Sequence, residues 1–313
     1  MKNTSKPLVS IIITCYNYAD FVQDAIESVD SQDYPFTEII VVDDGSTDKS
    51  AQKIKDISKK IPLTYLFQKN AGPSSARTSG LEASKGKYII FLDADDKLGK
   101  DYIKSNVNLS ISKNIPIVYT NFRFFGDSRG KSNLPEFKKD YLYISNYIHA
   151  SSLIHKKVFE YAGFDKALNR LRFDDWDFYL SAIDKGCTAI LNREVFLHYR
   201  VKKSSRSTDI TLEKFIKAFT HITSKYRKKN RGLDATFSNT DYFLQHLQST
   251  RLENANLANN LAELTAIKKQ TEAELKKVID NLQAENQRLN AIIHSPVKFS
   301  KHAAKFVLKK VKR

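Results

Sequence analysis

The chain has 313 residues with a formal net charge of +16, and such an excess favours nucleic acid, an anionic membrane face or phosphorylated substrates as partners. Its two cysteines, Cys15 and Cys187, lie far apart in sequence and argue against a disulfide framework or a cysteine-rich metal site. No apolar run reaches the roughly 18 residues of a membrane span or looks like a secretory signal, so we expect a cytoplasmic location.

Predicted strands alternate with predicted helices through the first 125 residues. Apolar runs predict strands at 8–14, 37–42, 63–68, 87–92 and 115–125. Helical periodicity and start signals predict helices at 19–32, 47–60, 72–84 and 100–113. This alternation is typical of βαβ units with right-handed crossovers, so we predict an α/β fold with a Rossmann-like, mostly parallel sheet.

The pattern is less regular from 140 to 205. It predicts a helix near 175–185 and two strands, TAILN and EVFLHYRV. We take 1–205 as the main domain and predict an amphipathic helix with a basic end in a linker at 206–231.

A composition typical of a long helix follows at 232–294, which has one glycine and no proline. Apolar residues fit alternating steps of four and three there, at Leu257, Leu261, Leu264, Leu275, Val278, Leu282, Leu289 and Ile292, and the skipped positions are occupied by the polar residues Lys268, Thr271 and Glu285. This spacing indicates a coiled coil, which would form a homo-oligomer or bind an assembly partner. The alternative is a single helix that folds back on the main domain.

The remaining segment, 295–313, is a basic tail. The last twenty residues of the chain carry six lysines, one arginine and no acidic residue. A basic amphipathic helix of this kind favours an anionic membrane surface, so we expect a peripheral protein on the inner face of the cell membrane. No zinc-finger, RNA-recognition or basic-zipper signature is present, so we do not expect a nucleic-acid partner. A solvated, disordered tail is the other interpretation.

Polar side chains follow three of the predicted strands. The ends TCYN, DDGS and DADD place eight of them at one edge of the sheet: Thr14, Tyr16, Asn17, Asp43, Asp44, Asp93, Asp95 and Asp96. Ligands of open parallel sheets bind at this edge. Like charges raise one another's pKa, so the cluster requires a positive group nearby. We expect Mg²⁺ or Mn²⁺ there, bridging the Asp-x-Asp carboxylates to a diphosphate, although any single aspartate could be a helix cap.

Arg77 follows NAGPSSA on the third predicted helix and is placed by sequence to contact a phosphate in a bidentate manner. Asp175 begins another helix beside Trp176, where burial against an aromatic ring would raise its pKa and suit a general base. The alternative interpretations are a surface arginine and a pair of helix-capping aspartates.

Five stretches, in this order and spacing, carry a resemblance to a known family: VSIIITCYN, VVDDGSTD, NAGPSSARTSG, GKYIIFLDADD and FDDWDFYLSAIDKG. Over residues 7–205 the chain resembles a family 2 glycosyltransferase with the GT-A fold, of the bacterial cell-surface glycan type. The resemblance implies an inverting enzyme that moves a sugar from a nucleotide-diphosphate donor, commonly a UDP-sugar. The implied acceptor is a hydroxyl of a polysaccharide or lipid-linked glycan precursor.

The resemblance also implies roles at the nucleotide site. Thr14 and Tyr16 match the first-strand motif that contacts the nucleotide, and we include Asn17 beside them. Asp44 matches the acid that hydrogen-bonds the base.

The resemblance further implies the metal and catalytic residues. Asp93 and Asp95 match the Asp-x-Asp motif, with Asp95 as the direct metal ligand and Asp96 as a neighbour that helps. Asp93 is also expected to contact the donor. Asp175 matches the catalytic base.

The sequence departs from the family pattern at three places. Asp174 stands where the family usually has Glu, and Thr78 replaces an Asn after Arg77. The family often has a histidine shortly after Tyr-Arg that completes the metal site, whereas here Val201 and Lys202 follow. His198, a lysine or water is left for that role.

Two other functions share some of these features. A nucleotidyltransferase also joins metal-binding carboxylates to a nucleotide site, and it would release pyrophosphate. A coiled-coil scaffold with an inactive transferase domain would show no turnover. The chain contains no G-x-G-x-x-G fingerprint or P-loop, which argues against a dehydrogenase and a P-loop ATPase.

Overall fold

The structure is a computed structural model that describes residues 6–143, 145–169, 171, 173–202, 214, 217–218, 221–222, 225–226, 268–277, 280–284 and 287. The chain divides into two compact units, Met1–Thr236 and Phe237–Arg313. No helix among the described residues is long and apolar enough to cross a membrane.

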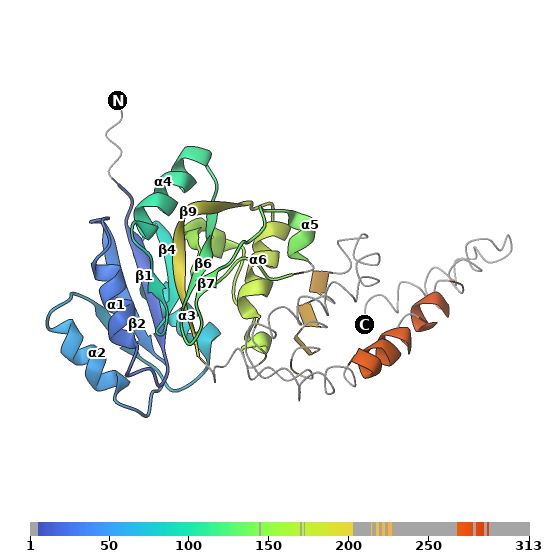
Figure 1. Ribbon diagram of the computed structural model, residues 1–313, viewed down its shortest axis with the longest axis horizontal. Coiled ribbons are helices and arrows are strands. Elements are labelled where there is room, and N and C mark those ends of the chain that lie inside the picture. The colour runs from blue at the N-terminus through green and yellow to red at the C-terminus, as the bar shows by residue number, and fades with distance from the viewer. Residues whose placement is uncertain are drawn as a thin grey trace. The chain divides into compact units, whose positions relative to one another are not determined.

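The described part of the first unit contains a nine-stranded sheet (Figure 1). Its strands are β1 Val9–Cys15, β2 Thr37–Asp43, β3 Thr64–Phe67, β4 Tyr88–Asp93, β5 Lys97–Leu98, β6 Ile117–Gly126, β7 Gly130–Lys131, β8 Leu153–His155 and β9 Ala189–Val201. Their order is β3-β2-β1-β4-β8-β6-β9-β5, with β7 paired to β6. The β3-β2-β1-β4 half is parallel, as predicted. The other half is mixed, because β8 runs antiparallel to both β4 and β6.

The helices of this unit lie close to the predicted ranges. They are α1 Val22–Asp30, α2 Ser50–Ser58, α3 Pro73–Ala83, α4 Tyr102–Lys113, α5 Lys139–Leu142 and α6 Asp174–Asp184, with 3₁₀ turns at Lys156–Glu160 and Lys166–Leu168. The short α5 and the 3₁₀ turns were not predicted, since three to five residues are too few to show a helical period.

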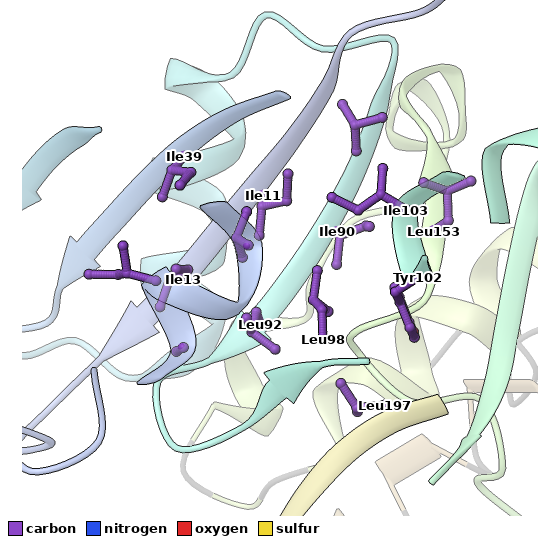
Figure 2. Packing of buried hydrophobic residues seen from close by; sticks show 14 of the residues in the cluster. Ile11, Ile13, Ile39, Ile90, Leu92, Leu98, Tyr102, Ile103, Leu153 and Leu197 are labelled. Atoms are coloured by element: carbon purple, nitrogen blue, oxygen red, sulfur yellow. The ribbon is translucent and has the colours of Figure 1, made fainter. Parts of the chain in front are cut away.

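Alternate side chains of the central strands pack on opposite faces of the sheet. Ile11 and Ile13 of β1 join a cluster with residues of α1 and α4, including Ile103 (Figure 2). Ile12 points to the other face, against α3. A side chain at Gly80 of α3 would collide with Ile12, so this glycine lets the helix approach the sheet closely. This close contact positions the first turns of α3 at the edge where β1 and β2 end.

The predicted pair of strands between 188 and 201 is one strand, β9. Its pairing with β6 shifts register after Asn192, so that Thr120 pairs with Asn192 and the next residue, Asn121, pairs with Phe196. The Asn192 side-chain oxygen accepts a hydrogen bond from Glu194 N at 3.0 Å, which stabilises the irregularity. The polar residues that suggested a turn between two strands therefore form a bulge.

Within the predicted linker at 206–231, every described residue is helical. Ala218, Ile222 and Tyr226 are buried, and Lys225 Nζ lies 2.7 Å from Oδ2 of the buried Asp177 in α6. The described residues Lys225 and Tyr226 therefore contact α6, the helix that carries Asp175.

In the second unit, residues 268–277, 280–284 and 287 are helical. Of the proposed coiled-coil seam, Leu275 and Leu282 are described, and Leu282 is 38% exposed. The coiled coil itself stays a prediction. The other seam residues and the basic tail at 295–313 lie outside the described residues.

Candidate active site

Polar residues from the carboxyl ends of three neighbouring strands meet at one edge of the sheet. β1 lies between β2 and β4, and Thr14 pairs in register with Asp93 while Cys15 pairs with Asp43. Thr14 Oγ1 donates a hydrogen bond to Asp93 Oδ1 at 3.1 Å. Asp44 N donates to Cys15 O at 2.8 Å, which extends the pairing past the end of β2. The predicted convergence of these ends is confirmed.

Asp44 is buried and organises the loop that precedes α3. Its carboxylate accepts hydrogen bonds from Gln68 Nε2 at 2.6 Å, Ala71 N at 2.9 Å and Gly72 N at 2.8 Å. Gly72 has a φ of +88°, a conformation that favours glycine, and Pro73 then begins α3. The structure therefore shows Asp44 as the anchor of this loop.

Asn17 connects the loops that follow β1 and β2. It adopts a left-handed φ of +58°, and its side-chain oxygen accepts from Thr47 N at 2.8 Å and Asp48 N at 3.3 Å. Asn17 N donates to Ser46 Oγ at 3.0 Å. The neighbouring Tyr16 is 38% exposed, so its ring is accessible to a ligand at the edge of the sheet.

Arg77 joins the end of β4 to the start of α6. Its Nη1 donates to Asp174 Oδ2 at 2.6 Å, and both side chains are 7% exposed. Its Nη2 lies 3.5 Å from Asp93 Oδ1. Burial lowers the pKa of Arg77, but the surrounding carboxylates, Asp174 first among them, outweigh burial and raise this pKa above its usual value. Arg77 is therefore not the surface arginine of the alternative interpretation.

Asp175 follows Asp174 in the first turn of α6 and is partly buried. Its Oδ1 accepts hydrogen bonds from Trp176 N at 2.8 Å and from Asn146 Nδ2 at 3.2 Å. Burial and the neighbouring Asp174 raise the pKa of Asp175 to about 6, against the opposing effect of Arg77. Asp175 thus has the local hydrogen bond expected of a helix start and also the raised pKa expected of a base.

Cationic and amide groups of β9 and the following residue contact the acidic cluster. Lys202 Nζ lies 2.7 Å from Asp95 Oδ2, and Arg200 Nε donates to the Asp95 carbonyl at 2.9 Å. Arg200 N donates to Oδ1 of the buried Asp96 at 2.8 Å. Burial, together with Asp95 and Asp93, raises the pKa of Asp96 well above its usual value. The chain therefore supplies positive charge of its own to the carboxylates for which the sequence suggested a metal ion.

The carboxylate oxygens at this edge fit a divalent ion that is bound by the protein and by a phosphate group at the same time. Among the described residues, no three His, Cys, Asp or Glu side chains form a group that could hold a metal. His198 does not complete one, since it pairs with Lys97 across β9 and β5 and its ring lies against Phe125. Mg²⁺ needs only one or two carboxylates when phosphates and water supply its other ligands. Asp93 and Asp95 can provide these.

Several residues at the site were not identified from the sequence. Asn146 and Ser74 contact Asp175 and Asp174 from distant parts of the chain, and no pattern near either residue indicates this contact. For Lys202 the sequence left a role open, because a lysine was one of the candidates for the place of the family's metal-binding histidine, but its ion pair with Asp95 was not predicted.

Sequence similarity to known proteins falls on the same part of the chain. The profile described as Glycosyl transferase family 2 matches residues 10–199. TuaG of Bacillus subtilis, a putative teichuronic acid biosynthesis glycosyltransferase, is 29% identical over 222 residues, which cover 65% of this chain and 83% of that protein. An uncharacterized glycosyltransferase of Haemophilus influenzae is 28% identical over 235 residues, covering 72% of this chain and 91% of that protein.

Solved structures show a similar fold. TarS 1-349 of S. aureus in complex with UDP-GlcNAc has a TM-score of 0.63 at 18% identity, with 78% of this chain and 74% of that chain covered. The mannosyltransferase PcManGT of Pyrobaculum calidifontis, in complex with GDP-Man and Mn²⁺, has a TM-score of 0.56 at 18% identity, with 73% and 66% covered. The fold is thus of the GT-A type. Because the family profile spans more than half of the chain, the protein belongs to glycosyl transferase family 2 and is a glycosyltransferase.

Proposed function

We propose that the protein transfers a sugar from a nucleotide-diphosphate donor to an acceptor hydroxyl, with inversion at the anomeric carbon. One observation carries this proposal. The Arg77 guanidinium lies 2.6 Å from Asp174 and 3.5 Å from Asp93. It thereby joins the strand end proposed to face the donor diphosphate to the helix that carries the proposed base, Asp175.

The donor is proposed to bind across the ends of β1, β2 and β4. The exposed ring of Tyr16 offers a face on which a nucleotide base can stack. Thr14 and Asp93 are hydrogen-bonded partners at the end of the central strands, where the diphosphate is proposed to lie. Asp44 holds the loop before α3 and retains acceptor capacity for a base. The UDP-GlcNAc bound to TarS supports a UDP-sugar donor.

Asp93 and Asp95 are the residues proposed to hold Mg²⁺ or Mn²⁺, with Asp96 behind them. When bound, such an ion acts as a Lewis acid and neutralises charge that develops on the leaving diphosphate. The Mn²⁺ in the PcManGT complex supports a divalent ion in this fold.

Asp175 is the proposed general base. It takes the proton of the acceptor hydroxyl as that oxygen bonds to the anomeric carbon and the bond from this carbon to the diphosphate oxygen breaks. The 3.2 Å hydrogen bond from Asn146 Nδ2 orients the carboxylate. Partial burial keeps its pKa close to 6, so it is ionised at neutral pH and still basic enough to accept a proton.

The rate should fall in acid with the titration of Asp175. With a pKa of about 6, the carboxylate is ionised above this pH and protonated below it. We expect kcat/KM to be constant above about pH 7 and to be about tenfold lower at pH 5. A series of rates from pH 4.5 to 8, with circular dichroism to show that the protein stays folded, measures this. A rate that is unchanged at pH 5 contradicts the assignment.

The acceptor is proposed to be a cell-surface polysaccharide or its lipid-linked precursor. The name of TuaG, which refers to teichuronic acid biosynthesis, supports this class of acceptor. The basic tail at 295–313 is proposed to bind an anionic membrane surface, on the inner face of the cell membrane, and the predicted coiled coil to form an oligomer.

A panel of UDP- and GDP-sugars tests the proposed function. Each sugar is supplied with Mn²⁺, with Mg²⁺ or with a chelator, and release of nucleoside diphosphate and protection from thermal unfolding are measured. We expect one donor class to raise the melting temperature and to release nucleoside diphosphate. Release of pyrophosphate from a nucleoside triphosphate would instead indicate a nucleotidyltransferase. If no donor gives turnover or protection from thermal unfolding, this result would favour the coiled-coil scaffold with an inactive transferase domain.

A further inference from the structure

The Lys202 ammonium is contacted by three groups that attract a cation, namely one carboxylate and two aromatic rings. Its Nζ lies 2.7 Å from Asp95 Oδ2. The same atom lies 4.3 Å from the ring centroid of Tyr18 and 4.9 Å from that of Phe21. The Lys202 side chain is 21% exposed and that of Asp95 14%. A carboxylate and two aromatic faces attract a cation together, and partial burial strengthens their effect.

The other cations nearby are held by a different carboxylate. Arg200 Nη2 lies 2.9 Å from Asp24 Oδ2, and its guanidinium lies 4.5 Å and 4.4 Å from the ring centroids of Phe21 and Phe125. Lys97 Nζ lies 2.8 Å from the same Asp24 oxygen. Lys202 is thus the cation paired with the Asp95 side chain among the described residues.

Lys202 reaches Asp95 from a fixed backbone. The strand β9 ends at the preceding residue, and Arg200 N is hydrogen-bonded to Asp96 Oδ1 at 2.8 Å. An ammonium group has three donors and no acceptor, so it cannot be a metal ligand. A histidine close to this position could ligate a metal ion. Lys202 instead places a positive charge at the carboxylate where the positive metal ion would bind.

We infer that Lys202 is a built-in competitor of the divalent ion at Asp95, so that the carboxylate holds either the ammonium or the metal. This inference rests on the proposed role of Asp95 as a metal ligand. Binding of the metal requires the ammonium to leave the carboxylate, because two cations on one carboxylate repel each other strongly. The consequence is a weak affinity of the donor-free protein for divalent ions.

Replacement of Lys202 by methionine tests the competition. Lys202→Met keeps an unbranched side chain against the two rings and removes the charge. We expect the Kd for Mn²⁺, measured on the full chain without donor by the electron paramagnetic resonance signal of free Mn²⁺, to fall at least tenfold. Lys202→Arg keeps the charge, so the affinity of this variant for Mn²⁺ should remain weak. Lys97→Met is the matched control, because it removes an equal charge that pairs with Asp24, and it should leave the Kd unchanged.

The outcomes separate this inference from the proposed function. An unchanged Kd in Lys202→Met, or no Mn²⁺ binding in either protein, overturns it. So does an equal gain in Lys97→Met, or a gain that persists when Asp95→Asn is added to Lys202→Met. Sugar transfer by the same wild-type preparation is assayed separately. Transfer without a gain in Mn²⁺ affinity leaves the proposed function standing, whereas the gain without transfer by any donor supports the competition alone. Melting temperatures verify that each variant is folded.

Discussion

Replacing Asp175 with asparagine is expected to lower the rate of sugar transfer by about 10²–10⁴-fold, the usual contribution of a general base. The amide has nearly the same shape as the carboxylate but cannot take up the proton of an acceptor hydroxyl. Donor binding should be preserved, because Asp175 does not lie at the strand ends proposed to hold the nucleotide and diphosphate. The measurement is kcat at saturating donor and acceptor, together with the donor Kd from calorimetry.

Stability serves as the control for this variant. The pKa of Asp175 is raised from 3.8 to about 6 in the folded protein, so its ionisation opposes folding as the pH rises from about 4 to 6. A neutral asparagine removes this cost, and the variant should be at least as stable as the wild type at pH 7. A large drop in kcat therefore cannot be attributed to unfolding. Should Asp175→Asn remain active while Asp174→Asn binds donor without transfer, the base is Asp174.

The central strands could be predicted because their composition reflects burial on both faces. β1 and β4 are continuous apolar runs, and each pairs with a strand on either side. Strands of two or three residues, such as β5 and β8, bury too few side chains to show a pattern. The sequence predicts two strands in place of the long β9, because a polar bulge and a turn have similar composition.

The acidic half of the site could be predicted, and its cationic half could not. Parallel strands must bring Asp93 close to Thr14 once the strand order is known. Lys202 and Arg200, by contrast, contact Asp95 from more than a hundred positions away. The family resemblance draws attention to this stretch, but nothing in the sequence indicates which acidic residue either cation contacts. The acidic cluster therefore does not by itself require a metal ion, because the fold brings Lys202 and Arg200 to it.

The same limit applies to Arg77, for which the sequence suggested a phosphate contact and the structure shows a buried ion pair. Replacing Arg77 with methionine is expected to lower the free energy of unfolding by about 3–5 kcal/mol, because Asp174 would stay buried without its cation. Asp93 would also lose the positive charge of the Arg77 guanidinium that lies 3.5 Å from its Oδ1. Urea unfolding followed by circular dichroism measures the loss as a shift of the midpoint at constant slope.

Two further variants separate burial from charge. Arg77→Met combined with Asp174→Asn removes both members of the pair, so it should recover part of the loss, since no uncompensated charge is then buried at Asp174. The exposed pair of Lys59 and Asp56 has a similar distance of 2.7 Å, but its side chains are 72% and 52% exposed. Lys59→Met should leave the free energy of unfolding unchanged, because water already solvates both charges. Equal effects of Arg77→Met and Lys59→Met would show that the contact at Asp174 contributes no more than a surface pair, and the role of Arg77 in joining β4 to α6 would have to be abandoned.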